Sequence, residues 1–188
     1  MARLHREILD ALLDRVVDGR YAAGTLLPKE QLIAEEFDVS RGTGREALRA
    51  LEERRVATVR HGRGATVQPP EEWNALDPIV AAALMRGRRR KAFLREIDEL
   101  RAQLEPAAAA LAAERASAKQ RAELREATGA EEPRRLIAAA AGNRPLAATL
   151  RALWEVEPPG EDAAAVAAAV ADGDAGRART EAARAVSG

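Results

Sequence analysis

The chain of 188 residues has no cysteine, only two histidines and 3% aromatic residues. The lack of cysteine excludes disulfide bonds, thiolate catalysis and cysteine zinc sites. No apolar run approaches the roughly 20 residues that a membrane-spanning helix needs. The amphipathic N-terminus carries acids throughout and does not have the pattern of a signal peptide. We therefore expect a soluble, cytoplasmic protein that does not enter a membrane.

Hydrophobic residues make up 47% of the chain, and alanine supplies much of that share. Alanine favours helices but buries little area per residue, so mainly α-helical cores that are closely packed and modest in depth are expected. The length allows one domain or two small ones. The formal net charge is +0, so a nucleic-acid partner would require the basic residues to be gathered on one face.

The stretch Val39 to Arg54 combines an apolar face with a cationic face at helical spacing. Arg41, Arg45 and Arg49 lie four residues apart and project from one side. Ser40 stands where its hydroxyl can cap the first turn. The inward positions are Val39, Ala47, Leu48 and Leu51. This pattern is typical of a recognition helix that enters a major groove, and the alternative is a solvated arginine stripe on an ordinary surface helix.

Two helices are predicted before this stretch, over Leu4 to Asp18 and Lys29 to Phe37. Tyr21 to Leu27 is expected to be a connector, and Asp38 to fill the turn between the second and third helices. The apolar stripe expected for the first helix is Ile8, Leu9, Leu12, Leu13 and Val16.

The β-prone runs Val56 to Arg60 and Ala65 to Gln68 follow, and the glycines of His61-Gly62-Arg63-Gly64 permit a hairpin between them. Three helices and this hairpin predict a winged helix-turn-helix over residues 1–70. The wing tip, with His61 and Arg63, would reach the DNA backbone or minor groove; a solvent-exposed turn histidine is the alternative for His61. From Ser40 to Arg63 there are seven arginines but only three acids.

Residues 71–91 are interpreted as a linker helix, Glu71 to Arg86, and a basic loop, Arg86 to Lys91. The loop could touch phosphate or simply be solvated. Residues 92–188 are expected to be all α, with a long helix through Leu111 that Pro106 kinks or restarts. The shorter helices are expected over Lys119 to Ala127, Pro133 to Ala141, Pro145 to Val156, Asp162 to Ala171 and Asp174 to Val186.

The first seventy residues resemble the GntR family of bacterial transcription regulators through LLPKEQLIAEEFDVSRGTGREALRALEERRV and HGRGATV. The resemblance implies DNA contacts by Arg41, Arg45 and the wing residues His61 and Gly62, and phosphate contacts by Ser40 and Thr43. Arg49 and Arg63 extend the same basic face.

The sequence departs from the GntR pattern at three places. Gln31 stands where the family often has an operator-contacting arginine, and Asp38 replaces a turn glycine. Gly44 replaces a β-branched core residue. Since Gly42 and Gly44 each cost roughly 0.5–1 kcal/mol relative to alanine in a helix, we expect a recognition helix that is less ordered before DNA binds.

The second half resembles the FCD type, the all-helical effector domain of the FadR subfamily, through WNALDPIVAAALM, FLREIDELRAQLEPAAAALAAERAS and LIAAAAGNRPLAATLRAL. It is shorter than that pattern between Glu126 and Pro133 and around Glu155 to Gly160. Many such domains bind a divalent metal through one aspartate and three histidines. Those four positions fall here on Ala130, Arg134, Ala163 and Ala185, so a metal site and a cofactor are not expected.

Arg134 is the candidate effector-binding residue, because a guanidinium beside an apolar bundle can pair with the carboxylate of a small organic acid. An arginine on a helix surface is the alternative. The favoured function is a homodimeric regulator, typically a repressor in this family, which binds a palindromic operator with its recognition helices roughly 34 Å apart. The alternative is a dimerising interaction protein with weak DNA binding. An enzyme is not favoured, because no nucleophile–base pair or phosphate-binding loop occurs.

Overall fold

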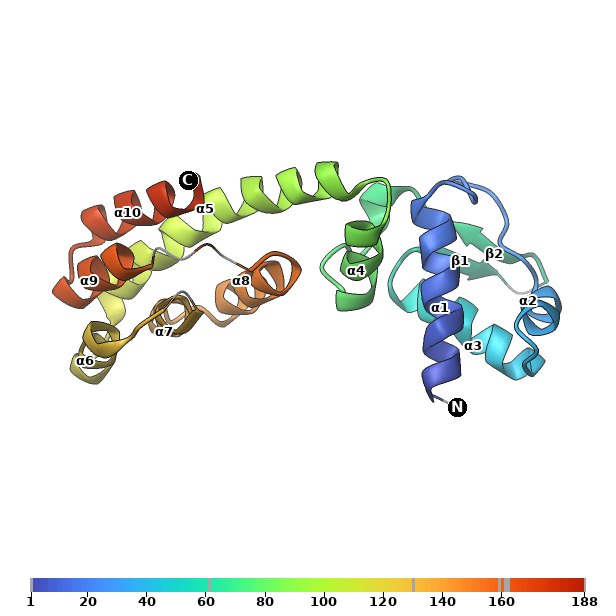
Figure 1. Ribbon diagram of the computed structural model, residues 1–188, viewed down its shortest axis with the longest axis horizontal. Coiled ribbons are helices and arrows are strands. Elements are labelled where there is room, and N and C mark those ends of the chain that lie inside the picture. The colour runs from blue at the N-terminus through green and yellow to red at the C-terminus, as the bar shows by residue number, and fades with distance from the viewer. Residues whose placement is uncertain (1, 61, 130, 159, 161–162, 188) are drawn as a thin grey trace. The chain divides into compact units, whose positions relative to one another are not determined.

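The computed structural model describes residues 2–60, 62–129, 131–158, 160 and 163–187. The chain divides into two compact units, Met1–Phe93 and Leu94–Gly188, and the division falls near the start of α5 (Arg90–Arg115). Figure 1 shows helices and a two-stranded sheet in the first unit, and helices in the second. The predicted mainly α fold with an N-terminal winged helix-turn-helix is confirmed. The predicted boundaries at residues 70 and 91 remain predictions.

The first unit consists of three helices, a hairpin, a 3-10 turn and a fourth helix. In chain order these are α1 (Ala2–Val17), α2 (Glu30–Glu36), α3 (Arg41–Glu53), β1 (Ala57–Arg60), β2 (Gly64–Val67), η1 (Pro70–Glu72) and α4 (Pro78–Arg86). The strands are antiparallel, with Ala57 opposite Val67. Side chains of the predicted α1 stripe are at most 4% exposed. They form the core together with Ile33, Ala47, Leu48, Leu51 and Val67. Val39 and Phe37 are only half-buried.

The connector between α1 and α2 pairs with the hairpin, which the sequence did not indicate. The Leu27 N–H donates to the Ala65 carbonyl at 2.8 Å, and the Val67 N–H donates to the Thr25 carbonyl at 3.0 Å. These bonds occupy backbone groups of β2 that would otherwise lie on an open edge. The wing is therefore tied to the segment that leads into α2.

The start of α3 shows why this helix contains a glycine at position 44. Ser40 caps the helix as predicted, since its Oγ accepts a hydrogen bond from the Thr43 N–H at 3.1 Å. Gly44 is buried, and a Cβ there would lie 2.7 Å from the Glu30 carbonyl oxygen, closer than van der Waals contact allows. The helix-propensity cost of Gly44 is only part of its effect, because its missing side chain also permits α3 to approach α2. The expected lower order of this helix before DNA binds stays a prediction. Asp38 between them has φ +51°, the left-handed conformation that favours the glycine it replaces.

The predicted linker helix over Glu71 to Arg86 is wrong in its first half. Only η1 and α4 are helical there, and α4 begins at Pro78. The physical reason is Asp77, whose Oδ1 accepts from the Ile79 and Val80 N–H groups at 2.9 and 3.3 Å. Proline suits the first helical position and disfavours helix in the residue before it. The pair Asp77-Pro78 is therefore a helix start signal in the sequence. Hydrophobic periodicity alone does not detect it.

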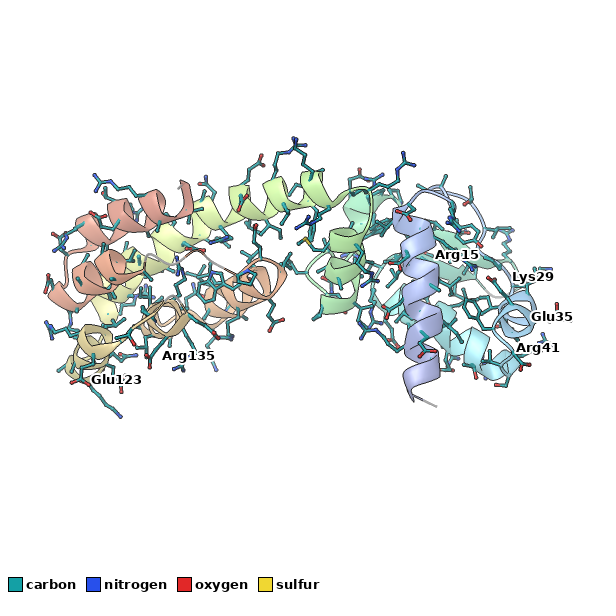
Figure 2. The ribbon with its side chains drawn as sticks, in the orientation of Figure 1. Arg15, Lys29, Glu35, Arg41, Glu123 and Arg135 are labelled. Carbon is teal, nitrogen blue, oxygen red and sulfur yellow. The ribbon has the colours of Figure 1, made fainter. Side chains whose placement is uncertain are left out.

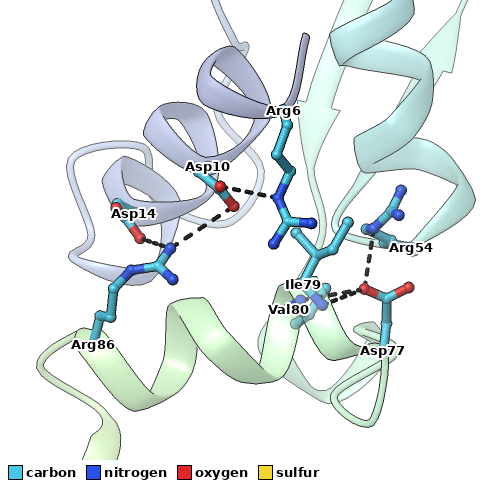
Figure 3. A network of polar contacts seen from close by, with 8 residues as sticks. All are labelled: Arg6, Asp10, Asp14, Arg54, Asp77, Ile79, Val80 and Arg86. Atoms are coloured by element: carbon cyan, nitrogen blue, oxygen red, sulfur yellow. Dashed lines mark hydrogen bonds and ion pairs between the residues drawn. The ribbon is translucent and has the colours of Figure 1, made fainter. Parts of the chain in front are cut away.

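α4 is held against the rest of the first unit by charged contacts at both of its ends (Figure 3). The Arg54 Nε at the end of α3 donates to Asp77 Oδ1 at 3.1 Å, and both side chains are about one-fifth exposed. At the other end of α4, Arg86 donates to Asp14 of α1 at 2.8 Å. The Asp77 carboxylate thus caps α4 and also binds Arg54 at the end of α3, the helix that carries the arginine stripe. The predicted basic loop shortens to residues 87–89, because α5 begins at Arg90.

The second unit contains the remainder of α5 and five further helices: α6 (Ala118–Glu126), α7 (Glu131–Ala140), α8 (Arg144–Val156), α9 (Ala164–Asp172) and α10 (Ala175–Ser187). These match the predicted helices within two residues, although Asp162, the expected start of one, lies outside the described residues. Pro106 lies inside α5 without ending it, so the expected restart does not occur. Leu100 on α5 is 37% exposed.

Arg121 joins two helix ends in this alanine-rich unit. Its guanidinium donates to the carbonyls of Ala113 and Ala116 at the end of α5, and to that of Ala171 at the end of α9. Helix ends leave carbonyls without partners, and a cation there also opposes the negative end of the dipole. Polar contacts to carbonyls therefore reinforce a core whose small side chains bury little area.

The glycines of α3 give a matched pair of substitutions. Gly44→Ala is expected to lower the free energy of unfolding by about 1–3 kcal/mol, the usual cost of overpacking, because its Cβ would meet the Glu30 carbonyl. Gly42→Ala is the control: its Cβ would meet only Ser40 Oγ at 3.5 Å, so it should gain about 0.5–1 kcal/mol from helix propensity. Urea denaturation of both variants measures this, and equal stabilisation by both would contradict the close approach.

A salt bridge between α1 and α2 predicts a pH dependence of stability. The Arg15 guanidinium donates two hydrogen bonds to the Glu36 carboxylate and thereby lowers the pKa of Glu36 below its ordinary value. A lowered folded-state pKa stabilises the protein above the unfolded pKa, about 4.3, and this contribution is lost as the pH falls through the folded pKa.

In Glu36→Gln the free energy of unfolding should therefore fall less as the pH is lowered. The difference should be no more than about 1 kcal/mol, because Glu36 is 42% exposed. Thermal unfolding between about pH 3 and 7 compares the variant with Glu35→Gln, whose side chain lies on α2 without an arginine partner in the described chain. Identical pH profiles for all three proteins would show that the Arg15 contact does not contribute.

Candidate functional site

The cationic face of α3 is exposed as a nucleic-acid interface requires. Arg41, Arg45 and Arg49 are all exposed. Arg41 lies 4.0 Å from Glu30 at the start of α2, and Arg49 lies 3.3 Å from Glu46 on its own helix. Arg45 makes no side-chain hydrogen bond or ion pair within the described chain. Its guanidinium is thus the one of the three whose donors are available without breaking a contact in the protein.

Ser40 and Thr43 hold the first turn of α3 in place. Besides the cap to the Thr43 N–H, the two side-chain oxygens lie 3.0 Å apart. The N-terminus of a helix presents free N–H groups and the positive end of the dipole. A phosphate at this turn would therefore meet the arginines, the capping hydroxyl and the dipole together.

Gln31 lies between the arginine helix and the wing. It lines a groove of about 610 Å³ with Arg63 and Lys29, and a second groove with Arg41 at the turn between α2 and α3. Its Nε2 donates to Glu35 Oε1 at 2.9 Å. Figure 2 places Lys29, Glu35 and Arg41 at the same end of the first unit. The structure thus brings Gln31, Arg41 and Arg63 onto one continuous surface.

The wing tip has the conformation that its glycines permit. Gly62 and Gly64 have φ values of +73° and +90°, and Arg63 between them is exposed. His61, the other predicted wing residue, lies outside the described residues. The sequence argument missed Lys29 and two exposed leucines near it, Leu26 and Leu32, at 61% and 55% exposure. The available sequence signal was the segment LLPKEQL (residues 26–32), which places leucines and a lysine around the start of the short second helix.

The second unit contains a buried charged cluster around Glu105. Its Oε1 accepts from Arg101 Nε at 2.8 Å and from Trp154 Nε1 at 3.0 Å. Arg101, Glu105 and Arg134 are between 5% and 8% exposed. Arg134 is therefore not on the helix surface, which was the alternative from sequence. Buried ions require partners because desolvation is costly, and the salt bridge with Arg101 meets this requirement for Glu105.

Three of the four positions that the FCD resemblance assigned to metal ligands meet at one cavity of about 20 Å³, which is lined among others by Arg134, Ala163 and Ala185. The fourth, Ala130, lies outside the described residues. A guanidinium and two methyl groups offer no lone pair to a cation, so these residues do not fit a metal. No cluster of three or more His, Cys, Asp or Glu able to hold an ion occurs in the described part of the chain.

These features define a winged helix-turn-helix unit whose third helix has an exposed basic face. Residues 4–67 match the family described as "Bacterial regulatory proteins, gntR family". This segment therefore matches the N-terminal helix-turn-helix domain of a family of bacterial regulators. No helix in the described residues is long and apolar enough to cross a membrane.

Curated relatives match over about three-fifths of the chain. The "Galactonate operon transcriptional repressor" of Escherichia coli (strain K12) is 35% identical over 120 residues, covering 64% of this chain and 52% of its own. The "Uncharacterized HTH-type transcriptional regulator Rv0494" of Mycobacterium tuberculosis is 36% identical over 115 residues, covering 61% and 46%. The chain thus spans about half the length of these relatives.

Among solved structures, "Streptococcus agalactiae GntR" covers 97% of both chains, with 21% identity and a TM-score of 0.45. These values are too low for any property of that protein to be carried over.

The Arg134 cavity is lined by one carboxylate, that of Glu105, which already binds Arg101 and Trp154. This predicts that divalent ions do not stabilise the protein. Zinc, nickel or EDTA should leave the melting temperature unchanged, measured by calorimetry. A ligand that binds the native state at 100 times its Kd would add about 2.7 kcal/mol and raise the melting temperature by several degrees. Such a rise, retained after His5→Ala and His61→Ala, would mean that the helical unit does hold a metal.

Proposed function

We propose that this chain is a sequence-specific transcription regulator that binds a palindromic operator as a homodimer. The observation that carries the proposal is the exposed arginine face of α3, on which Arg45 has no partner in the described chain, beside a glycine wing that carries Arg63. Arg41 and Arg45 would contact base edges or phosphates in the major groove. Contacts to the DNA backbone would fix the position of α3 along the groove, and we assign them to Arg49, Gln31, Ser40 and Thr43. The wing would reach the same DNA backbone through Gly62, Arg63 and His61.

Repression is the proposed direction of regulation. The Escherichia coli relative with 35% identity is named a repressor. A dimer that covers an operator with two recognition helices blocks access to that DNA by occupancy alone, without a further activity.

The second unit is proposed to dimerise and to bind an effector, as an FCD-type domain of the FadR subfamily would. The effector would be a small organic acid held through Arg134. A ligand can shift the arrangement of two DNA-binding units only by binding one arrangement better than another. The lack of a fitting metal site means that a charged side chain, and not an ion, would have to bind the carboxylate.

A dimerising interaction protein with weak DNA binding is the second candidate. It is favoured by one observation: the cavity in the helical unit is only about 20 Å³, room for about one water molecule. An effector domain that has closed on itself would leave dimerisation as its function. The DNA-binding experiment below separates the two candidates.

The test is fluorescence anisotropy with the DNA upstream of the chain's own gene, at several salt concentrations. Arg45→Ala is expected to weaken binding by about 1–3 kcal/mol, the value of a good bidentate base contact, and the wild-type affinity should fall steeply with log salt. Saturation should require two chains per operator. Arg179→Ala, an exposed arginine on α10, is the matched control and should bind as the wild type does.

Equal, weak binding of wild type and Arg45→Ala, at about 10⁻⁴–10⁻⁶ M, would mean that α3 does not read this DNA. If a random-sequence selection then also yielded no preferred site, the interaction-protein candidate would replace the regulator.

A further inference from the structure

The helical unit has two concave regions that share Arg134 and Trp154 but differ greatly in size. The internal cavity holds about 20 Å³, whereas a groove lined by residues of α7 and α8 has about 430 Å³. Pockets for small molecules typically range from about 300 to 1,000 Å³. A ligand of this unit therefore fits the groove and does not fit the cavity.

Two exposed arginines line this groove from neighbouring helices. Arg135 comes from α7 and Arg151 from α8; Figure 2 labels Arg135 on α7. Glu131 and Glu155 line it as well, each four residues from one of these arginines, yet no ion pair within 4.0 Å joins them in the described chain. Both guanidiniums therefore keep their donors available.

The inner wall of the groove is fixed by packing. Arg134 is 6% exposed and contributes a third positive charge with interactions of its own. Trp154 is half-buried, and its Nε1 is bound to Glu105, so its ring has a defined orientation. A buried guanidinium acts at lower effective dielectric than an exposed one, and an indole ring supplies an apolar wall against which the body of a ligand can pack.

We propose that the α7–α8 groove binds a small anion with two or more negative charges, of carboxylate or phosphate type, between Arg135 and Arg151. The arginine fork matches both kinds of oxygen pair. An anion in the groove could accept hydrogen bonds from both guanidiniums. The proposal depends on the proposed function only in calling such an anion an effector; the binding site itself stands on the groove.

The experiment uses the full chain and the fluorescence of Trp154, with Trp73→Phe as the background because the sequence has only two tryptophans. Citrate and inorganic phosphate are titrated separately, each against sodium chloride at equal ionic strength. At least one of them should change the Trp154 emission with saturation, and calorimetry on the chain without the Trp73 substitution should give the same affinity. The two titrations distinguish a carboxylate site from a phosphate site.

Arg135→Ala and Arg151→Ala should each weaken this binding about tenfold or more, the effect of one lost charge-assisted hydrogen-bond pair. Arg144→Ala is the matched control, since Arg144 is exposed at the start of α8 and does not line the groove. It should bind as the unsubstituted chain does. Exposed residues are chosen in place of Arg134, whose removal could disturb the buried cluster.

The proposal is overturned if neither anion gives saturable fluorescence and heat signals beyond those of sodium chloride. It is also overturned if Arg135→Ala and Arg151→Ala bind with the affinity of the Arg144→Ala control. No DNA is present in these titrations, so their failure leaves the regulator function standing. Conversely, loss of operator binding would not alter the result at the groove.

Discussion

The close approach of α3 to α2 at Gly44 is the constraint on which the DNA-binding unit depends. A side chain at this position would strike the backbone carbonyl of Glu30, and backbone cannot move aside as a flexible side chain can. The contact fixes the distance between the two helices, while Ser40 fixes where α3 begins and Asp77 anchors its last turn through Arg54. The arginine face is consequently presented from a helix that is held in its first turn and at its end.

The helical unit is stabilised in a different way. Its core is rich in alanine, whose burial contributes little per residue, and arginine side chains bind carbonyl and carboxylate groups beside that core. Arg121 closes the ends of two helices, and Glu105 gathers Arg101 and Trp154. The internal cavity beside Arg134 is only about 20 Å³. The proposed anion site is therefore the groove between α7 and α8.

The sequence predicted those parts of the fold that repeat or that carry local signals. The α1 stripe, the Ser40 cap and the glycine wing follow from periodicity and turn chemistry over a few residues. Contacts between distant segments could not be predicted that way: the pairing of Thr25 and Leu27 with β2 depends on tertiary packing, as does the need for glycine at position 44. Asp77-Pro78 was predictable, since capping followed by proline is a local signal.

The candidate site shows the same division. The arginine spacing on α3 predicted its exposed face, but not that Arg41 and Arg49 have acidic neighbours while Arg45 has none in the described chain. Arg134 was placed by resemblance alone, and its burial became visible only when α5, α7 and α8 were assembled around it. Arg135 and Arg151 carried no sequence signal, because two arginines sixteen residues apart become neighbours at a groove only through the packing of their helices.

Selection of DNA sites from a random-sequence pool by the full-length chain tests the central claim most directly. The structure predicts enrichment of a two-fold symmetric site whose half-sites lie about one helical turn apart, with base preferences that relax at defined positions when Arg45→Ala is used in the same selection. An unenriched pool, or the same consensus from wild type and Arg45→Ala, would contradict the assignment of α3 as the helix that reads DNA.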